Sequence, residues 1–203
     1  MAVHSVLATF VLPVAQAMRA RGVDAMELVE SAGIDPAGME NPDRRIPMTS
    51  WHQLLARSVE ETGDEAFGLF AAEQIQPQVL HGLGLAWLAG DRLLDGLART
   101  VRFSKMMSTG ADLSLVQEGE EVRLVIGPSV KGEDFEFTAR DFAMGMLVRM
   151  CQLTLGEFFA PLLVEMERPC PQQPDRWEYM LASRVHFDCP VARMSFSLAD
   201  INE

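Results

Sequence analysis

The pattern of apolar and polar residues changes its period in the middle of the chain, which predicts a helix followed by a β-hairpin. An apolar run from Val79 leads to a turn at Gly90, and we expect this run to be buried. From Asp91 to Lys105 the apolar residues recur mainly at helical spacings, with Asp91 as the expected N-cap. After Gly110 apolar and polar residues alternate, as in strands with one buried face. The apolar positions of these two strands are Leu113, Leu115, Val122, Leu124 and Ile126, with a turn over Glu118–Glu120.

Helices precede this central stretch, and a mixture of helices and strands follows it. The expected early helices are 12–20, 24–32, 49–62 and 65–73, the third of them capped by Thr49 and Ser50, with 36–47 as a connecting loop. The expected later elements are a loop over 128–132, a long helix from Asp134 or Glu136 to Leu155, strands over 161–167, 185–187 and 194–198, and a short helix over 174–182.

This order of elements predicts an α+β fold, with a mostly antiparallel sheet packed against several helices and an N-terminal helical portion. We expect 1–75 to form the helical subdomain and 76–203 the α+β portion of one compact domain. The length of 203 residues suffices for one full core, and 48% hydrophobic with 23% charged residues is typical of a globular protein.

Charge and cysteine content narrow the class of protein further. A net charge of -12 argues against a nucleic-acid surface on this chain, because phosphate contacts need clustered Lys and Arg. Cys151, Cys170 and Cys189 are odd in number and far apart, which favours a reduced cytoplasm over a disulfide framework. No window reaches the roughly 18 apolar residues of a membrane span, and the N-terminal segment lacks the basic region of a signal peptide. We therefore expect a cytoplasmic protein without membrane contact.

The chain lacks the sequence motifs of common enzymes. It has no G-x-S-x-G elbow, phosphate-binding glycine loop, dinucleotide fingerprint or H-E-x-x-H helix. The histidines are scattered, and no two have metal-ligand spacing on one helix. Cys151 lies among apolar residues of the long helix and is expected to be a structural thiol. These observations predict a protein that is not an enzyme and holds no metal or cofactor.

Methionine-rich helices instead favour the binding of a small molecule. Several of the 13 methionines lie on the two helices expected to cover the hairpin, and methionine adapts to flexible apolar ligands. Ordinary core packing is the alternative for each of them. We predict a ligand site between the hairpin and these helices, which requires a cavity of about 300 Å³ or more. Its expected apolar walls are Trp87, Phe103, Met107, Phe142 and Met146.

Three polar residues are candidates to contact such a ligand. His81 lies in the apolar run, where a half-buried structural histidine is the alternative. Arg149 follows Met146 by one turn and is a candidate anchor for an acidic or polar head group, unless it extends from the helix edge into water. Arg123 faces away from the core if its strand neighbours face it, and a one-residue register shift inverts this.

The run from Pro77 to Ile126, which contains VLHGLGLAWLAGDRLLDGLARTVRFSKMM, resembles the middle of the arabinose-binding-type N-terminal domain of AraC-family transcriptional regulators. The opening, 11–73, is similar to the start of that domain in its helix, its GIDP turn and its RIP connector. The close, 175–202, resembles its end, with FDCP before a short strand and a terminal Asp-Ile. The resemblance covers nearly the whole chain, and its motifs are apolar patterns with no catalytic signature.

The resemblance implies an effector-sensing and dimerising domain of a bacterial transcription regulator. Such regulators bind a small molecule, form homodimers and contact DNA through two helix-turn-helix units. This chain ends at Glu203 before any such segment, so we expect an excised sensor domain or a natural stand-alone version. Two alternatives remain open: a haem-based or gas-sensing domain with His81 as axial ligand, and a protein-interaction module without a ligand.

Overall fold

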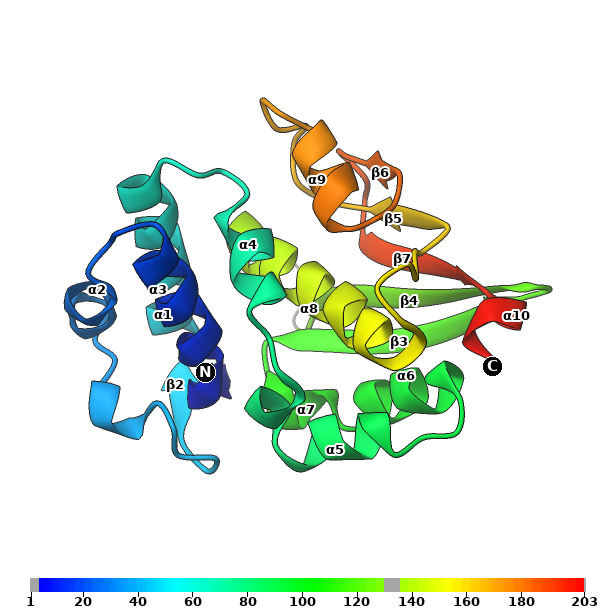
Figure 1. The fold of residues 1–203 in the computed structure, drawn as a ribbon, viewed down its shortest axis with the longest axis horizontal. Coiled ribbons are helices and arrows are strands. Elements are labelled where there is room, and N and C mark those ends of the chain that lie inside the picture. The colour runs from blue at the N-terminus through cyan, green and yellow to red at the C-terminus, as the bar shows by residue number, and fades with distance from the viewer. Residues whose placement is uncertain (1–3, 130–135, 203) are drawn as a thin grey trace.

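The computed structural model describes residues 4–129 and 136–202, with a five-stranded sheet at one end of the molecule and a group of N-terminal helices at the other (Figure 1). The strands are β1 (Ser5–Leu7), β2 (Arg45–Pro47), β3 (Ala111–Glu118), β4 (Glu121–Pro128), β5 (Leu163–Glu165), β6 (Val185–His186) and β7 (Ala192–Ser197). The large sheet has the order β3-β4-β7-β5-β6, antiparallel except between β5 and β6, while β1 and β2 form a separate antiparallel pair.

The helices are α1 (Val11–Ala20), α2 (Ala25–Ser31), α3 (Met48–Thr62), α4 (Phe67–Glu73), α5 (Gly82–Leu88), α6 (Leu93–Arg102), α7 (Ser104–Met107), α8 (Phe137–Leu155), α9 (Asp175–Met180) and α10 (Leu198–Ile201). Short 3-10 turns occur at η1 (Ala8–Phe10), η2 (Pro36–Gly38) and η3 (Pro77–Leu80). Helices packed on a mainly antiparallel sheet make this an α+β fold, as the sequence predicts.

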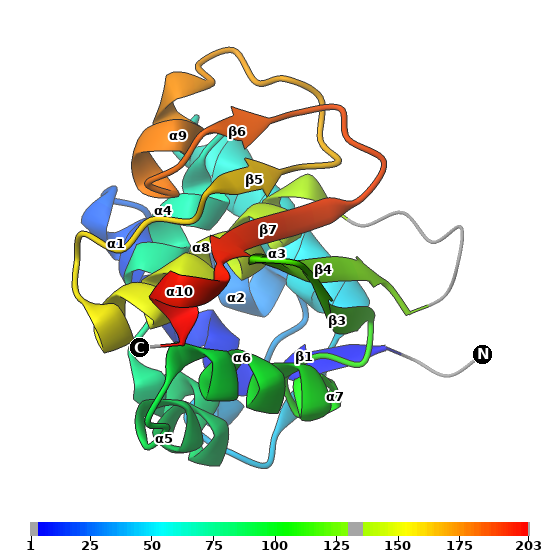
Figure 2. The same ribbon diagram turned by 90° about the vertical axis from the view of Figure 1, so that its right-hand side faces the viewer.

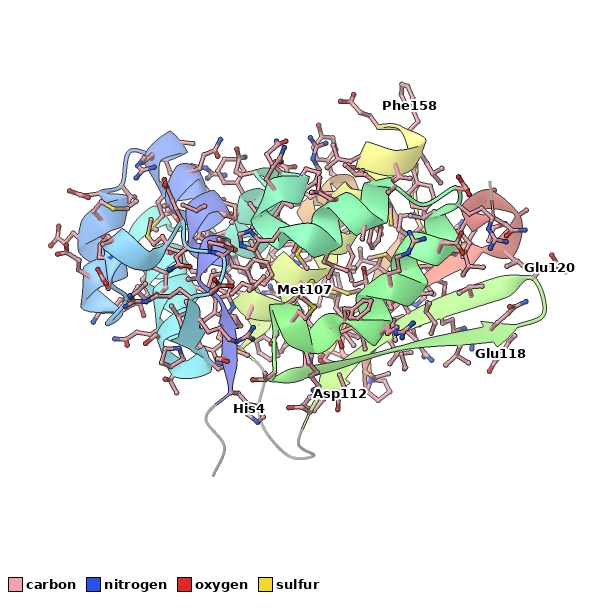
Figure 3. All side chains as sticks on the ribbon, turned by 90° about the horizontal axis from the view of Figure 1, so that it is seen from below. His4, Met107, Asp112, Glu118, Glu120 and Phe158 are labelled. Carbon is pink, nitrogen blue, oxygen red and sulfur yellow. The ribbon has the colours of Figure 1, made fainter. Side chains whose placement is uncertain are left out.

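The hairpin β3–β4 is confirmed in position, register and orientation. Glu118 pairs with Glu121 across a two-residue loop, and Gly119 has φ +62°, a conformation that glycine adopts without strain. Val122 and Leu124 are buried, and the intervening Arg123 lies on the other face of the sheet, as expected. Figure 3 shows Glu118 and Glu120 at the protruding tip of the hairpin, far from the buried Met107.

The helical segment before the hairpin is shorter than predicted and broken. The N-cap of α6 is Arg92 and not Asp91, and the helix stops at Phe103 before α7 begins. The break turns Met106 outward, with 58% of its surface exposed, although the helical pattern placed it on the buried face. The preceding apolar run is also only partly buried, because Leu85 on α5 is 64% exposed. Figure 2 shows α6 and α7 beneath the hairpin.

The longest helix, α8, is confirmed and begins at one of the two predicted N-caps. The side chain of Glu136 accepts hydrogen bonds from the backbone amides of Thr138 and Ala139, which offsets unpaired donors of the first turn. Asp134 and most of the predicted loop 128–132 lie outside the described residues. A nearly continuous set of apolar side chains buries α8 between the sheet and α4.

The N-terminal part differs from the prediction at three points. Strand β1, which pairs with β2, lies in a segment where no strand was predicted. The segment 36–47 was predicted to be a loop because it is rich in Pro, Gly, Asn and Asp, but it contains η2 and strand β2. The three residues RIP are too few to show an alternating pattern. Pro47 is the N-cap of α3, so Thr49 and Ser50 lie inside its first turn and do not cap it. Buried residues of this part and of the sheet form one core cluster, and the division into a helical subdomain over 1–75 and an α+β portion over 76–203 stays a prediction.

Asp24 caps α2, and its replacement by alanine is expected to lower the free energy of unfolding by about 1 kcal/mol. Its Oδ1 accepts hydrogen bonds from the amides of Met26 and Glu27, at 3.0 and 3.4 Å. Chemical denaturation of Asp24→Ala against Asp24→Asn checks this, because asparagine keeps the accepting oxygen and is expected to retain most of the stability. Equal losses in the two variants would contradict a capping role.

Candidate functional site

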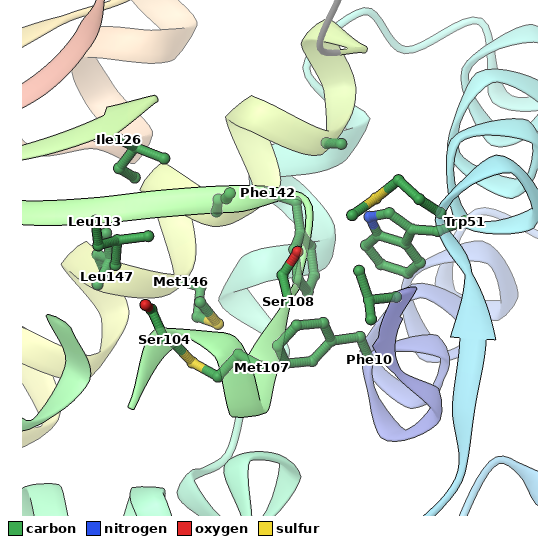
Figure 4. Close-up of a pocket in the computed structure, with 15 residues that line it drawn as sticks. Phe10, Trp51, Ser104, Met107, Ser108, Leu113, Ile126, Phe142, Met146 and Leu147 are labelled. Atoms are coloured by element: carbon green, nitrogen blue, oxygen red, sulfur yellow. The ribbon is translucent and has the colours of Figure 1, made fainter. Parts of the chain in front are cut away.

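An apolar cavity lies between the hairpin, α7, α8 and the N-terminal helices (Figure 4). Its volume is about 60 Å³. The side chains that form its walls come from four parts of the chain: Phe10, Met48 and Trp51; Ser104 and Met107; Leu113 and Ile126; Phe142, Ala143, Met146 and Leu147. The cavity therefore lies where the N-terminal part meets the α+β part.

Three aromatic rings form one wall of the cavity. Phe142 of α8 contacts both Phe10 and Trp51, with ring centroids 5.6 and 5.2 Å apart and edge-to-face geometry. Phe10 and Trp51 lie 6.1 Å apart. Edge-to-face pairs at these distances are favourable beyond the area that they bury. This wall is consequently the more rigid side, and the unbranched Met107 and Met146 on the other side are its adaptable part (Figure 4).

The cavity contains very few polar groups. Among the described residues that line it, only Ser104 and Ser108 carry a side-chain hydroxyl, and none carries a charge. None of these lining residues is a general acid or base or forms a nucleophilic pair. The walls can enclose an apolar group and offer it at most two hydroxyl contacts.

The cavity is smaller than the predicted ligand site requires. Its volume of about 60 Å³ holds a few water molecules at most, whereas pockets for small ligands have about 300 Å³ or more. A larger occupant has to displace side chains. The preformed pocket expected from the sequence is therefore absent from the described residues at this position.

Three of the eight predicted contact residues lie together on this cavity: Met107, Phe142 and Met146. The two other predicted apolar residues lie elsewhere. Trp87 is buried against Gly96, and its indole Nε1 donates a hydrogen bond to Thr154 Oγ1 at 2.8 Å. Phe103 is 41% exposed at the break between α6 and α7.

The three predicted polar contacts are also away from the cavity. Arg123 pairs with Glu118 and Glu121 on the outer face of the hairpin, both at 2.8 Å. Arg149 lines a separate surface pocket beside α4. His81 ends η3 with φ +50°, and its buried Nε2 has no hydrogen-bond partner among the described residues. Their role in binding stays a prediction, and the cavity walls do not include them.

Phe10, Met48 and Trp51 were missed because they come from the N-terminal part. Met48 and Trp51 are three residues apart on the buried face of α3, a pattern that indicates burial without naming the partner. The cavity arises only where this face meets Phe142 of α8, about ninety positions later in the chain. No local periodicity predicts such a contact.

The described parts of the chain offer little support for a metal site, a reactive cysteine or a membrane-spanning helix. No group of three His, Cys, Asp or Glu side chains there is placed to hold a metal ion. Cys151 is buried, and burial raises the pKa of its thiol far above the ordinary value, so the reactive thiolate is disfavoured. None of the described helices is long and apolar enough to cross a bilayer.

Comparisons with known proteins place this geometry in context. Residues 22–203 match the family described as the arabinose-binding domain of AraC transcription regulators, N-terminal. The ornithine utilization regulator of Pseudomonas aeruginosa is 20% identical over 169 residues, which are 83% of this chain and 50% of that protein. The crystal structure of the transcriptional regulator CdpR from Pseudomonas aeruginosa has a similar fold, with a TM-score of 0.60 and 13% identity over 95% of this chain and 56% of that one. The chain thus spans about half the length of the relatives that it matches.

Proposed function

The chain belongs to the family of arabinose-binding domains at the N-terminus of AraC transcription regulators, and from this membership we propose that it senses a small apolar effector. In this proposal the effector binds in an expanded form of the cavity lined by Met107, Phe142 and Met146. The supporting observation is the position of the cavity, which touches the hairpin, α7, α8 and the N-terminal helices at once.

The walls favour an apolar effector over a sugar. A sugar carries a hydroxyl on nearly every carbon, and each buried hydroxyl needs a hydrogen-bond partner. Ser104 and Ser108 are too few to supply these partners. An aromatic or aliphatic group, by contrast, gains from contact with the rings and the two methionines.

The effector acts by changing how the surrounding elements are arranged. It needs more room than about 60 Å³, so it binds better to an arrangement in which α7 and the methionine side chains have moved apart. A ligand shifts an equilibrium only by its difference in affinity for the two states. That shift is relayed to a DNA-binding part of the same regulator. Homodimer formation and a cytoplasmic location also belong to this proposal, and they rest on family membership alone.

A variant that fills the cavity tests the proposal directly. Ala143→Leu adds an aliphatic side chain to the wall, so it is expected to abolish the rise in melting temperature caused by an apolar compound. The measurement is a thermal-shift screen with fatty acids, aromatic acids and sugars. Ala20→Leu, at an exposed position near the end of α1, is the matched control and is expected to keep the response. If no apolar compound stabilises the parent protein, or Ala143→Leu responds as strongly as Ala20→Leu, the proposal fails.

One observation favours a second function, a protein-interaction module without a ligand. The small volume of the cavity, about 60 Å³, fits an ordinary packing defect of a core. That function predicts no stabilising compound in the same screen. A haem-sensing domain has less support, because His81 does not line the cavity. An absorption spectrum of the purified protein tests it through the presence or absence of a Soret band.

A further inference from the structure

A second, polar pocket lies on another face of α8, between α8, α4 and α9. Its volume is about 330 Å³, several times that of the apolar cavity. The side chains that carry its chemistry are Glu73 and Gln74 from α4, Arg149 and Gln152 from α8, and Met180 at the end of α9. It shares no lining residue with the apolar cavity, so the two sites can be tested separately.

Arg149 is the unusual group in this pocket. Arg140 on the same helix and Arg168 beside it, both buried, are paired with carboxylates, whereas Arg149 is half-buried. What distinguishes Arg149 is that it forms no ion pair and donates no hydrogen bond to any residue in the described ranges; its Nε is also buried without an acceptor, a feature that it shares with other arginines of this region. A buried donor left without a partner is rare, because it has lost water and gained nothing. A carboxylate can satisfy a guanidinium with two parallel hydrogen bonds.

Glu73 faces the same pocket with the opposite charge. Burial raises the pKa of its carboxyl, while the charges of Arg149 and Arg21 oppose that rise. Arg21 is already engaged, since it pairs with Asp64 at 2.7 Å and stacks on the ring of Phe70. No ion pair within 4.0 Å joins Glu73 to Arg149. The charges of Glu73 and Arg149 therefore interact across the pocket without forming an ion pair, so both remain available to a ligand.

We propose that this pocket binds a free amino acid, whose α-carboxylate pairs with Arg149 and whose ammonium group pairs with Glu73. The charges exclude simpler ligands. An inorganic anion such as phosphate satisfies Arg149 but is repelled by Glu73, and an amine alone leaves the Nε of Arg149 unpaired. Gln74 and Gln152 add neutral hydrogen-bonding groups to the lining.

The apolar part of the pocket indicates the kind of amino acid. Leu69, Val148 and Met180 line it beside the charged pair. Leu69 and Val148 are themselves buried, so the half-buried Met180 supplies most of the apolar surface that an aliphatic side chain would cover, and none of the three adds a charge. We therefore expect a preference for aliphatic amino acids over acidic and basic ones. The occupant would contact α4 and α8, the same helices whose packing supports the apolar cavity from the other side.

Isothermal titration of the whole chain with L-leucine tests this site. Two half-ligands serve as probes: 4-methylpentanoate, which lacks the ammonium group, and 3-methylbutylamine, which lacks the carboxylate. We expect L-leucine to bind and both half-ligands to bind at least about tenfold more weakly, because each leaves one of the two charges of the pocket without a partner. Binding of 4-methylpentanoate to Ala143→Leu, in which the apolar cavity is filled, or of phosphate to the parent, as tight as that of leucine overturns the proposal, as does the absence of binding by L-leucine, L-valine and L-methionine alike.

Charge variants give the sharper result. Arg149→Met is expected to abolish leucine binding. Glu73→Gln is expected to lower the affinity for leucine and raise the affinity for 4-methylpentanoate, so that 4-methylpentanoate becomes the tighter ligand. Arg19→Met, at an exposed position on α1, is the matched control and is expected to bind like the parent. Circular dichroism confirms that each variant is folded. Unchanged leucine binding in Arg149→Met contradicts the proposal. Ala143→Leu is expected to keep leucine binding, which separates this site from the apolar cavity.

Discussion

Replacing Arg168 by methionine is expected to lower the free energy of unfolding by about 3–5 kcal/mol, because it leaves a buried carboxylate without its partner. Asp141 on α8 is fully buried and accepts hydrogen bonds from Arg168 Nη1 and, at 3.1 Å, from Trp177 Nε1. Arg168, itself 6% exposed, also binds Glu65 at 2.7 Å. The cluster joins α8 and α9 to the segment just before α4, and its buried centre is Asp141. Urea denaturation followed by circular dichroism measures the loss.

The size of this loss is expected to depend on pH. Burial raises the pKa of Asp141 to about 7, although Arg168 and Trp177 both lower it. The folded protein thus holds a proton that the unfolded chain releases near 3.8. This carboxyl contributes stability at low pH that is lost as the pH rises through about 7. Without Arg168 the pKa of Asp141 rises further, so Arg168→Met is expected to lose more stability at about pH 8 than at about pH 5.5.

Two further variants separate the buried charge from a general loss of side-chain contacts. Asp141→Asn keeps the shape, but its amide has one NH₂ group, and both partners of Asp141 are donors. Whichever way the amide turns, one donor faces another, so a large loss is expected here too. Arg193→Met removes the ion pair with Glu165 on the outer sheet face, where the arginine is 31% exposed, and about 1 kcal/mol or less is expected. Equal losses in Arg168→Met and Arg193→Met would show that burial does not strengthen the first pair.

The parts of the fold that the sequence predicted are those whose signal is local. The hairpin needs only the alternation from Leu113 to Ile126 and a glycine at its turn, and both lie within a short window. The long helix α8 needs an N-cap at Glu136 and an apolar pattern to Leu155. These features keep their form whatever they pack against, so their prediction survives the tertiary structure.

The errors lie where tertiary contacts override a local pattern. The apolar pattern from Asp91 to Lys105 is helical throughout, yet α6 ends before Phe103 and a separate short helix, α7, lines the cavity. Strand β2 is too short to signal itself and is recognisable only through its pairing with β1. The polar site residues show the same limit. Helical spacing places Arg149 on one side of α8, but only the structure shows that Glu73 of α4 shares its pocket.

Replacing Gly68 by alanine is expected to lower the free energy of unfolding about as much as Arg168→Met. Gly68 is buried in α4 where this helix crosses α8, and a Cβ there would lie 2.3 Å from the carbonyl oxygen of Thr138 and 3.0 Å from the Cβ of Asp141. Neither neighbour is the free end of a flexible side chain, so the two helices have to move apart. Overpacking of a core costs about 1–3 kcal/mol, and a clash with backbone belongs at or above the upper end. Gly68→Ala is therefore expected to lose about 3 kcal/mol or more in urea denaturation.

Gly82 provides the matched control, because it is a helical glycine without a close neighbour. A Cβ at Gly82 of α5 meets no atom within 4 Å, and alanine is favoured over glycine in a helix by up to about 1 kcal/mol. Gly82→Ala is therefore expected to match or exceed the stability of the parent. If α4 and α8 are far enough apart to accept alanine at position 68, Gly68→Ala and Gly82→Ala will be equally stable, and the prediction is wrong. In that case the polar pocket beside Glu73 and the aromatic wall at Phe142 would both lose the close helix packing that positions them.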